Sequence, residues 1–148
     1  MKKILFLLIS ISFPAQATEC QTNANFIIHD IYSDPDYKQF VCANNDCPID
    51  YFANSITIYQ ESLGSDVIGC FATPIRKARN FYTGFYVIKE GKIRPQFIFF
   101  GTWLTPKKDT HASPTPLVGI EYIEAGELER HQFSWNGRDY LETQTKEK

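Results

Sequence analysis

The sequence predicts a mainly β protein of the α+β class, a curved antiparallel meander sheet with one or two short helices, stabilised by disulfides. Short runs rich in β-branched and aromatic residues recur along the chain, and the connections between them carry Gly, Pro, Asn or Asp. Neighbouring strands must be antiparallel, because such connections are too short for a parallel crossover. Four cysteines are available for the disulfides.

Residues 1–17 have the features of a secretory signal peptide. Two lysines precede an apolar run at 4–13, and a small-x-small cleavage sequence follows at 15–17. The apolar run is too short to span a bilayer core of roughly 30 Å as a helix. We therefore expect export to the periplasm of a single domain, residues 18–148, without membrane insertion.

The mature chain has a small negative net charge. Cleavage removes two of the 15 basic side chains and none of the 17 acidic ones, so the formal net charge changes from −2 to −4. This charge argues against a nucleic-acid partner and favours a cationic one.

The expected elements follow the apolar runs in order. The predicted strands are 26–32, 55–60, 66–71, 81–89, 93–100, 117–123, 130–135 and 138–143. The first of these runs could also be helical, 73–80 is the best short-helix candidate, and we expect the polar tail 141–148 to fray.

Three sequence features constrain how four of these strands pair. Pro95 lacks a backbone donor, so we expect it near the start of its strand or at a sheet edge. The sequence Lys-Glu-Gly-Lys at 89–92 fits either a two-residue turn or a three-residue loop. Asn136-Gly137 favours a two-residue type I′ hairpin, which fixes a register with the aromatic side chains on one face. The expected pairs are Trp135 with Arg138, Phe133 with Tyr140, and His131 with Glu142.

The four cysteines allow three pairings in an oxidising compartment. We favour Cys42 with Cys47, which enclose a turn-prone run, and Cys20 with Cys70, which would tie down a terminus.

The sequence offers no persuasive catalytic, cofactor or metal site, so we expect a protein that is not an enzyme. No serine nucleophile-elbow motif or phosphate-binding glycine loop is present, and the histidines lack metal-ligand spacing. A hydrolase using His29, Asp34 and Asp36 is the weakest alternative, since Asp34-Pro35-Asp36 is also typical of a turn.

The candidate binding site is the six-residue ring that the Cys42–Cys47 bridge would close. Asn44, Asn45 and Asp46 tolerate turn geometry and carry hydrogen-bonding side chains. A rigid polar ring suits insertion into a polar cleft. The alternative is a turn whose disulfide only stabilises a small exported domain.

The ring sequence Cys-Ala-Asn-Asn-Asp-Cys resembles the cysteine-bracketed loop of the Ivy family of periplasmic lysozyme inhibitors. The segment 55–73 also resembles the strand, turn and Gly-x-Phe strand that follow this loop, so the resemblance covers about 40–73. It implies a short disulfide loop that enters the active-site cleft of lysozyme. Asn45 stands where the family's loop carries a histidine, and an amide can form hydrogen bonds but cannot become cationic.

We therefore expect a periplasmic inhibitor whose partner is a protein, a peptidoglycan-degrading enzyme such as lysozyme, contacted by Asn44, Asn45 and Asp46. An immunity protein against a secreted antibacterial toxin is a close alternative. A small envelope ligand-binding or assembly module is another, using the aromatic sheet face around Trp135 and Tyr140.

Overall fold

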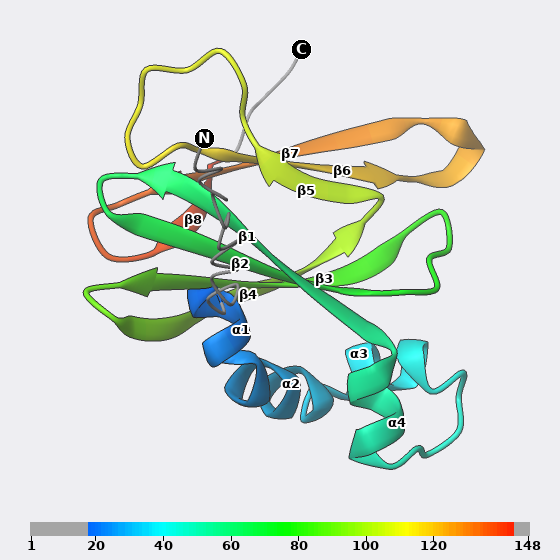
Figure 1. Cartoon of the computed structure of the whole chain (residues 1–148). Coiled ribbons are helices and arrows are strands. Elements are labelled where there is room, and N and C mark those ends of the chain that lie inside the picture. Colours follow the sequence, from blue (N-terminus) through cyan, green and yellow to red (C-terminus); the bar gives the residue numbers. More distant parts are fainter. Residues whose placement is uncertain (1–17, 144–148) are drawn as a thin grey trace, which may run out of the picture.

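The computed structural model describes residues 18–143, which form three layers (Figure 1). Short helices cover one face of a four-stranded sheet, and a second four-stranded sheet packs on its other face. The predicted fold class, mainly antiparallel sheet with a few short helices and disulfides, is confirmed.

The helices lie in the N-terminal segment. Among the described residues they are α1 (Glu19–Thr22), α2 (Ala24–Tyr32), α3 (Pro35–Val41) and α4 (Ile49–Asn54), and a 3₁₀ turn, η1 (Glu124–Gly126), follows much later. Within residues 18–143, no helix is long and apolar enough to cross a membrane.

Two segments differ from their predicted secondary structure. Residues 26–32, grouped with the strands but left open to a helix, belong to α2. Residues 75–80 form no helix, because Pro74 ends a strand and the Ile75 N–H donates to the Ser55 carbonyl at 2.8 Å. The chain after Pro74 is thereby tied to the end of α4 rather than to a helical turn of its own.

The strands form two meanders. The first sheet has the order β1 (Ile56–Gly64), β2 (Val67–Pro74), β3 (Phe81–Lys89) and β4 (Lys92–Gly101). The second has the order β5 (Trp103–Pro106), β6 (Leu117–Tyr122), β7 (Leu128–Trp135) and β8 (Tyr140–Thr143). The short strand β5 is an element that the apolar runs did not predict.

The β3–β4 turn resolves one open alternative. Lys89 pairs with Lys92, so the turn has two residues, and Glu90 and Gly91 both adopt positive φ, at 52° and 71°. Pro95 lies near the start of β4, an edge strand of the first sheet, as expected for a residue without a backbone donor.

The predicted β7–β8 register is wrong by two residues. Trp135 pairs with Tyr140, and Phe133 pairs with Glu142, so the loop 136–139 has four residues. The Asn136 side-chain oxygen accepts hydrogen bonds from the Arg138 and Asp139 N–H groups, both at 2.9 Å. This local capping favours the longer loop. Because the shift is two residues, the aromatic side chains stay on the predicted face.

The prediction that residues 141–143 are frayed is wrong. Residues 141–143 belong to β8. The rest of that tail and the predicted signal peptide at 1–17 lie outside the described residues.

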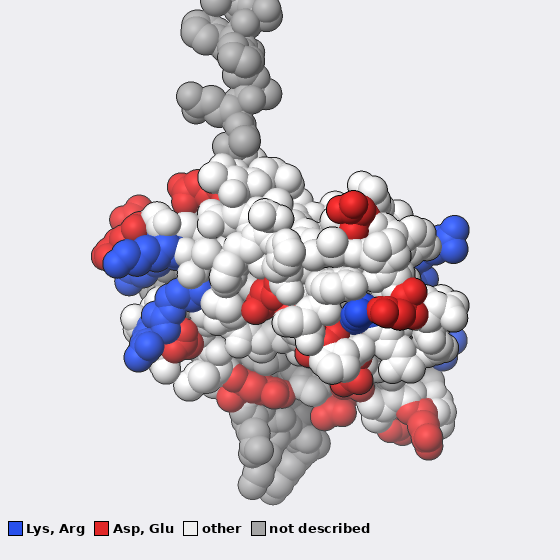
Figure 2. Space-filling view, turned by 90° about the horizontal axis from the view of Figure 1, so that it is seen from below, with Lys and Arg blue, Asp and Glu red and all other residues white. Residues whose placement is uncertain are grey.

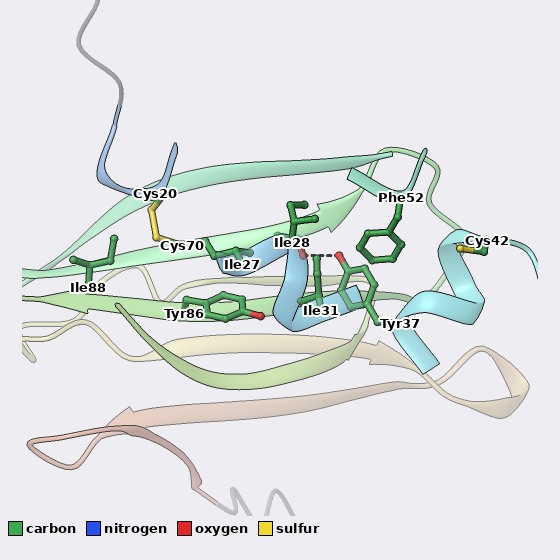
Figure 3. Close-up of a cluster of buried hydrophobic side chains, with 11 residues drawn as sticks. Cys20, Ile27, Ile28, Ile31, Tyr37, Cys42, Phe52, Cys70, Tyr86 and Ile88 are labelled. Carbon is green, nitrogen blue, oxygen red and sulfur yellow. Dashed lines mark hydrogen bonds between the residues drawn. A yellow bond between two sulfur atoms is a disulfide. The ribbon is translucent and has the colours of Figure 1, made fainter. Parts of the chain in front are cut away.

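Two apolar clusters separate the layers. One fills the space between the first sheet and the helices and contains Ile27, Ile31, Tyr37, Phe52 and Tyr86 (Figure 3). The buried Tyr37 hydroxyl donates to the Ala72 carbonyl at 2.8 Å. The other lies between the two sheets, with Phe71, Phe85, Phe99, Leu117 and Phe133 among its members. The strands β2 and β3 are therefore buried on both faces.

The disulfides are those that the sequence analysis favoured. Cys20 pairs with Cys70 across 50 residues, inside the helix-side cluster, and Cys42 pairs with Cys47 across five. Two disulfides fit a protein exported to an oxidising compartment.

Candidate functional site

The ring 42–47 begins where α3 ends. Asp34 caps the start of α3 by accepting a hydrogen bond from the Tyr37 N–H at 2.8 Å, and Pro35 occupies the first turn. At the other end Ala43 and Asn44 adopt positive φ, at 53° and 64°. The Asn44 N–H then donates to the Gln39 carbonyl at 3.1 Å, the bond that closes a Schellman motif. The ring therefore leaves the helix in a defined direction.

Three further side-chain bonds hold the ring. Gln39 donates to the Asn44 side-chain oxygen at 2.7 Å, and the Lys38 ammonium lies 2.6 Å from an Asp46 carboxylate oxygen. The Tyr32 hydroxyl donates to the Cys47 carbonyl at 2.8 Å. Two of these contacts come from α3 and one from α2, so residues of two helices hold the ring.

The Lys38–Asp46 pair keeps both groups charged. The hydrogen bond to Lys38 lowers the pKa of Asp46, and the hydrogen bond to Asp46 raises the pKa of Lys38. The Lys38 ammonium also lies 4.3 Å from the centre of the Tyr32 ring. The Asp46 side chain nevertheless remains 86% exposed, so a partner could still reach the carboxylate.

Asn45 is the ring residue whose side chain has the weakest intramolecular contact. Its amide nitrogen lies 3.4 Å from the Ala43 carbonyl, at the limit of a hydrogen bond. Asn44, Asn45 and Asp46 are all exposed, as the prediction requires. The three side chains therefore differ: those of Asn44 and Asp46 are bonded to α3, whereas the Asn45 amide has only one weak contact within the ring.

Two shallow hollows of about 330 Å³ each lie beside the ring. We call the first the Ile75 hollow, whose lining includes Phe40, Ala43, Tyr51, Ile75 and Arg76. The second, the Asn44 hollow, is lined by Asp36, Gln39, Phe40, Ala43, Asn44, Tyr82 and Phe100. Tyr51, Ile75 and Phe100 are large apolar side chains that remain exposed. The polar ring therefore lies between two surfaces that expose apolar side chains.

Sequence reasoning did not identify the braces or the hollows. Phe40 and Gln39 could have been found from helical spacing had α3 been recognised, since Asp34-Pro35 is a helix-start signal. Tyr82 and Phe100 come from paired positions on β3 and β4, and no local pattern links them to residue 44.

The residues of the hydrolase alternative have other local roles. Asp34 caps α3, Asp36 is exposed in the first turn of the same helix, and His29 is exposed on α2. Nothing in these positions orients the three toward a common reacting atom.

The aromatic face of β7 and β8 is largely core. Tyr140 and Phe133 are buried between the two sheets, and the half-buried Trp135 packs edge-on against Tyr140 with ring centres 5.3 Å apart. Little of this face is available as a flat platform for stacking a ligand.

One cluster in the described chain brings together groups that could ligate a metal. The ligand atoms of Glu121, Glu129 and His131 lie within 4.8 Å of one another, and Glu142 contacts the other ring nitrogen of His131 at 2.6 Å. Exposed acidic groups of this kind are common without a metal, so the cluster carries no metal assignment.

Comparisons of this chain with protein-family models, with curated proteins and with solved structures find no match.

Proposed function

We propose that the mature protein is a periplasmic inhibitor that inserts the ring 42–47 into the active-site cleft of a cell-wall-degrading enzyme such as lysozyme. The observation that supports this proposal is an exposed polar ring tip held by a disulfide and three side-chain bonds from neighbouring helices. Inhibition would be steric and stoichiometric, since the ring would occupy the space of the substrate.

Rigidity matters because binding must otherwise order the loop. Each side chain that is already fixed lowers the ordering cost of association by roughly 0.5 to 1.5 kcal/mol. Asn44 and Asp46 are fixed in this way by Gln39 and Lys38. The Asn45 amide, which has a donor and an acceptor, would then form the central hydrogen bonds with the cleft.

The charge of the helix layer supports a cationic partner. Residues 18–54 carry six carboxylates, listed here as Glu19, Asp30, Asp34, Asp36, Asp46 and Asp50, and a single lysine, Lys38. Figure 2 views the molecule from the side of this layer and shows acidic side chains spread across the face, with most basic ones near its margins. Such a field attracts a basic surface at low ionic strength and is screened within about 8 to 10 Å at physiological salt.

An inhibition assay tests the proposal directly. The purified protein, residues 18–148, is added in increasing amounts to egg-white lysozyme and to peptidoglycan amidases, and the lysis of cell-wall substrate is measured. We expect one of these activities to be lost near equimolar ratio, with a complex that co-elutes in size-exclusion chromatography.

The matched control is the double variant Cys42→Ser, Cys47→Ser, which opens the ring and should inhibit less well. Inhibition of a bacterial amidase without inhibition of lysozyme would support the cleft-inserting ring and favour the immunity-protein variant of the proposal. Full activity of every enzyme at a large excess of the protein would contradict the proposed function.

A further inference from the structure

The Asn44 hollow has aromatic walls. Phe40 and Tyr82 meet edge to face with ring centres 5.7 Å apart, and Tyr82 and Phe100 lie 4.7 Å apart in a tilted arrangement. These rings come from α3, β3 and β4, so the helix layer and the first sheet together hold them in place. Phe100 is 40% exposed, which leaves part of an aromatic surface open to solvent beside the ring.

The rim of the same hollow is acidic. Asp36 lines it and is exposed, while the residues that line it include no lysine or arginine. Burial raises the pKa of the Tyr82 hydroxyl, and the nearby carboxylates of Asp36 and Asp34 raise it further. Asp36 is therefore the carboxylate that faces the hollow, and Asp34 lies near enough to affect the Tyr82 hydroxyl.

Aromatic surface and carboxylate together favour a cationic ligand group, and the planar guanidinium of arginine more than the compact ammonium of lysine. A purely apolar side chain would cover Asp36 without giving its carboxylate a partner, which is unfavourable. An anion would be repelled by Asp36. A guanidinium can stack flat on an aromatic ring and donate hydrogen bonds to a carboxylate at the same time.

We propose that the Asn44 hollow is a subsite that receives an arginine side chain from the rim of the cleft entered by the ring. This inference rests on the proposed function. Asn44 belongs both to the ring and to the hollow, so a cleft that receives the ring would bring its rim against the hollow. The arginine subsite would fix the orientation of the partner around the inserted ring.

The subsite can be tested without the partner enzyme. N-acetyl-arginine amide is titrated into isotopically labelled protein at low salt, and NMR follows the signals of Tyr82, Phe100 and Asp36. We expect saturable shifts at these residues in the millimolar range. The matched probe N-acetyl-citrulline amide has nearly the same shape but no charge, so it should bind at least about fivefold more weakly. Equal shifts with both probes, or shifts confined to other surfaces, would overturn the arginine subsite.

Two variants connect the subsite to the inhibited enzyme. Asp36→Asn and Phe100→Ala should each weaken the affinity for that enzyme about threefold to tenfold, and Asp36→Asn should also reduce its dependence on salt. Asp50→Asn is the control, since Asp50 is an exposed carboxylate of α4 that lines neither hollow.

These results separate the two proposals. If Asn45→Ala weakens inhibition but Asp36→Asn and Asp50→Asn behave alike, the subsite is refuted and the inhibitory ring stands. If no enzyme is inhibited but the arginine probe binds as described, the inhibitor proposal fails while the chemistry of the subsite holds.

Discussion

The two disulfides of this protein close loops that differ in length and in exposure to solvent. Cys20 and Cys70 are both fully buried in the helix-side core and close a long loop that includes α2, α3 and α4. Cys42 is buried in the same cluster and Cys47 is half-buried, but the short ring that they close has an exposed tip at 43–46. In the chain-entropy model a bridge across 50 residues stabilises the fold by about 4 kcal/mol and one across five residues by about 2 kcal/mol. The fully buried Cys20–Cys70 bridge thus mainly stabilises the fold, and the Cys42–Cys47 bridge mainly fixes the shape of the ring.

The largest expected effect comes from the buried bridge. Replacing both Cys20 and Cys70 by Ser should lower the free energy of unfolding by about 4 kcal/mol, since α1 would no longer be linked to β2. Urea denaturation monitored by circular dichroism measures this change. A loss below about 1 kcal/mol would show that the buried bridge is not the main covalent stabiliser.

Opening the ring 42–47 should lower stability less than removing the Cys20–Cys70 bridge does, and it should weaken binding to the inhibited enzyme. The double variant Cys42→Ser, Cys47→Ser should lose at most about 2 kcal/mol of unfolding free energy, because its loop is short. Its affinity for the inhibited enzyme should fall, since the freed ring must be ordered on binding. Unchanged affinity, measured by isothermal titration calorimetry, would remove the functional role assigned to this bridge.

Two tyrosines provide the same comparison without changing a disulfide. Tyr37→Phe removes the buried hydrogen bond to Ala72 and should cost about 1 kcal/mol of stability, with no effect on binding. Tyr32→Phe removes the brace on the Cys47 carbonyl, so it should weaken binding several-fold, with a smaller change in melting temperature than Tyr37→Phe. Binding affinities are measured by titration calorimetry and melting temperatures by scanning calorimetry. If Tyr37→Phe weakened binding and Tyr32→Phe lowered the melting temperature more, the core and the ring would not have the separate roles assigned to them.

The smallest expected effect lies outside both disulfide regions, at His131. Its two ring nitrogens contact Glu142 at 2.6 Å and Glu121 at 3.2 Å, and both contacts are hydrogen bonds only when the imidazole carries two protons. Burial lowers the pKa of His131, but Glu142, Glu129 and Glu121 outweigh it, so the pKa is raised overall.

A histidine whose pKa is raised by folding stabilises the folded state at pH values below its pKa in the unfolded state, about 6.5. This stabilisation is lost as the pH rises through its pKa in the folded state. His131→Gln should therefore cost about 0.5 kcal/mol at pH 5.5 and less at pH 9. Melting temperatures of the variant and the wild type at these two pH values measure the effect. A larger loss at pH 9 than at pH 5.5 would contradict this assignment.

The strands were predictable because their apolar runs are long and bounded by turn residues. The segment 81–89 forms β3 with the predicted bounds, and the fold class followed from such runs. The helices were harder to predict, because each has four to nine residues and shows little periodicity. Asp34-Pro35 was interpreted as a turn, although the same residues cap and begin α3.

Side-chain hydrogen bonds explain the remaining errors. The capping bonds of Asn136 select a four-residue loop over the two-residue hairpin that Asn-Gly favours. For the candidate site, the sequence identified the ring and the exposed residues 44–46. The braces from Lys38 and Gln39 depend on where α3 ends, and the Asn44 hollow depends on the pairing of β3 with β4, so neither could be inferred from local sequence.

The most direct test of the account is the affinity of Asn45→Ala for the inhibited enzyme, measured beside its melting temperature. The exposed Asn25 of α2 provides the matched control, Asn25→Ala. We expect Asn45→Ala to weaken binding by roughly 1 to 3 kcal/mol, as for a central interface residue, and to change stability by no more than about 0.5 kcal/mol. Asn25→Ala should leave binding unchanged. If Asn45→Ala binds as tightly as the wild type, or if it weakens binding only by melting early, the ring is a structural staple and not an inhibitory plug.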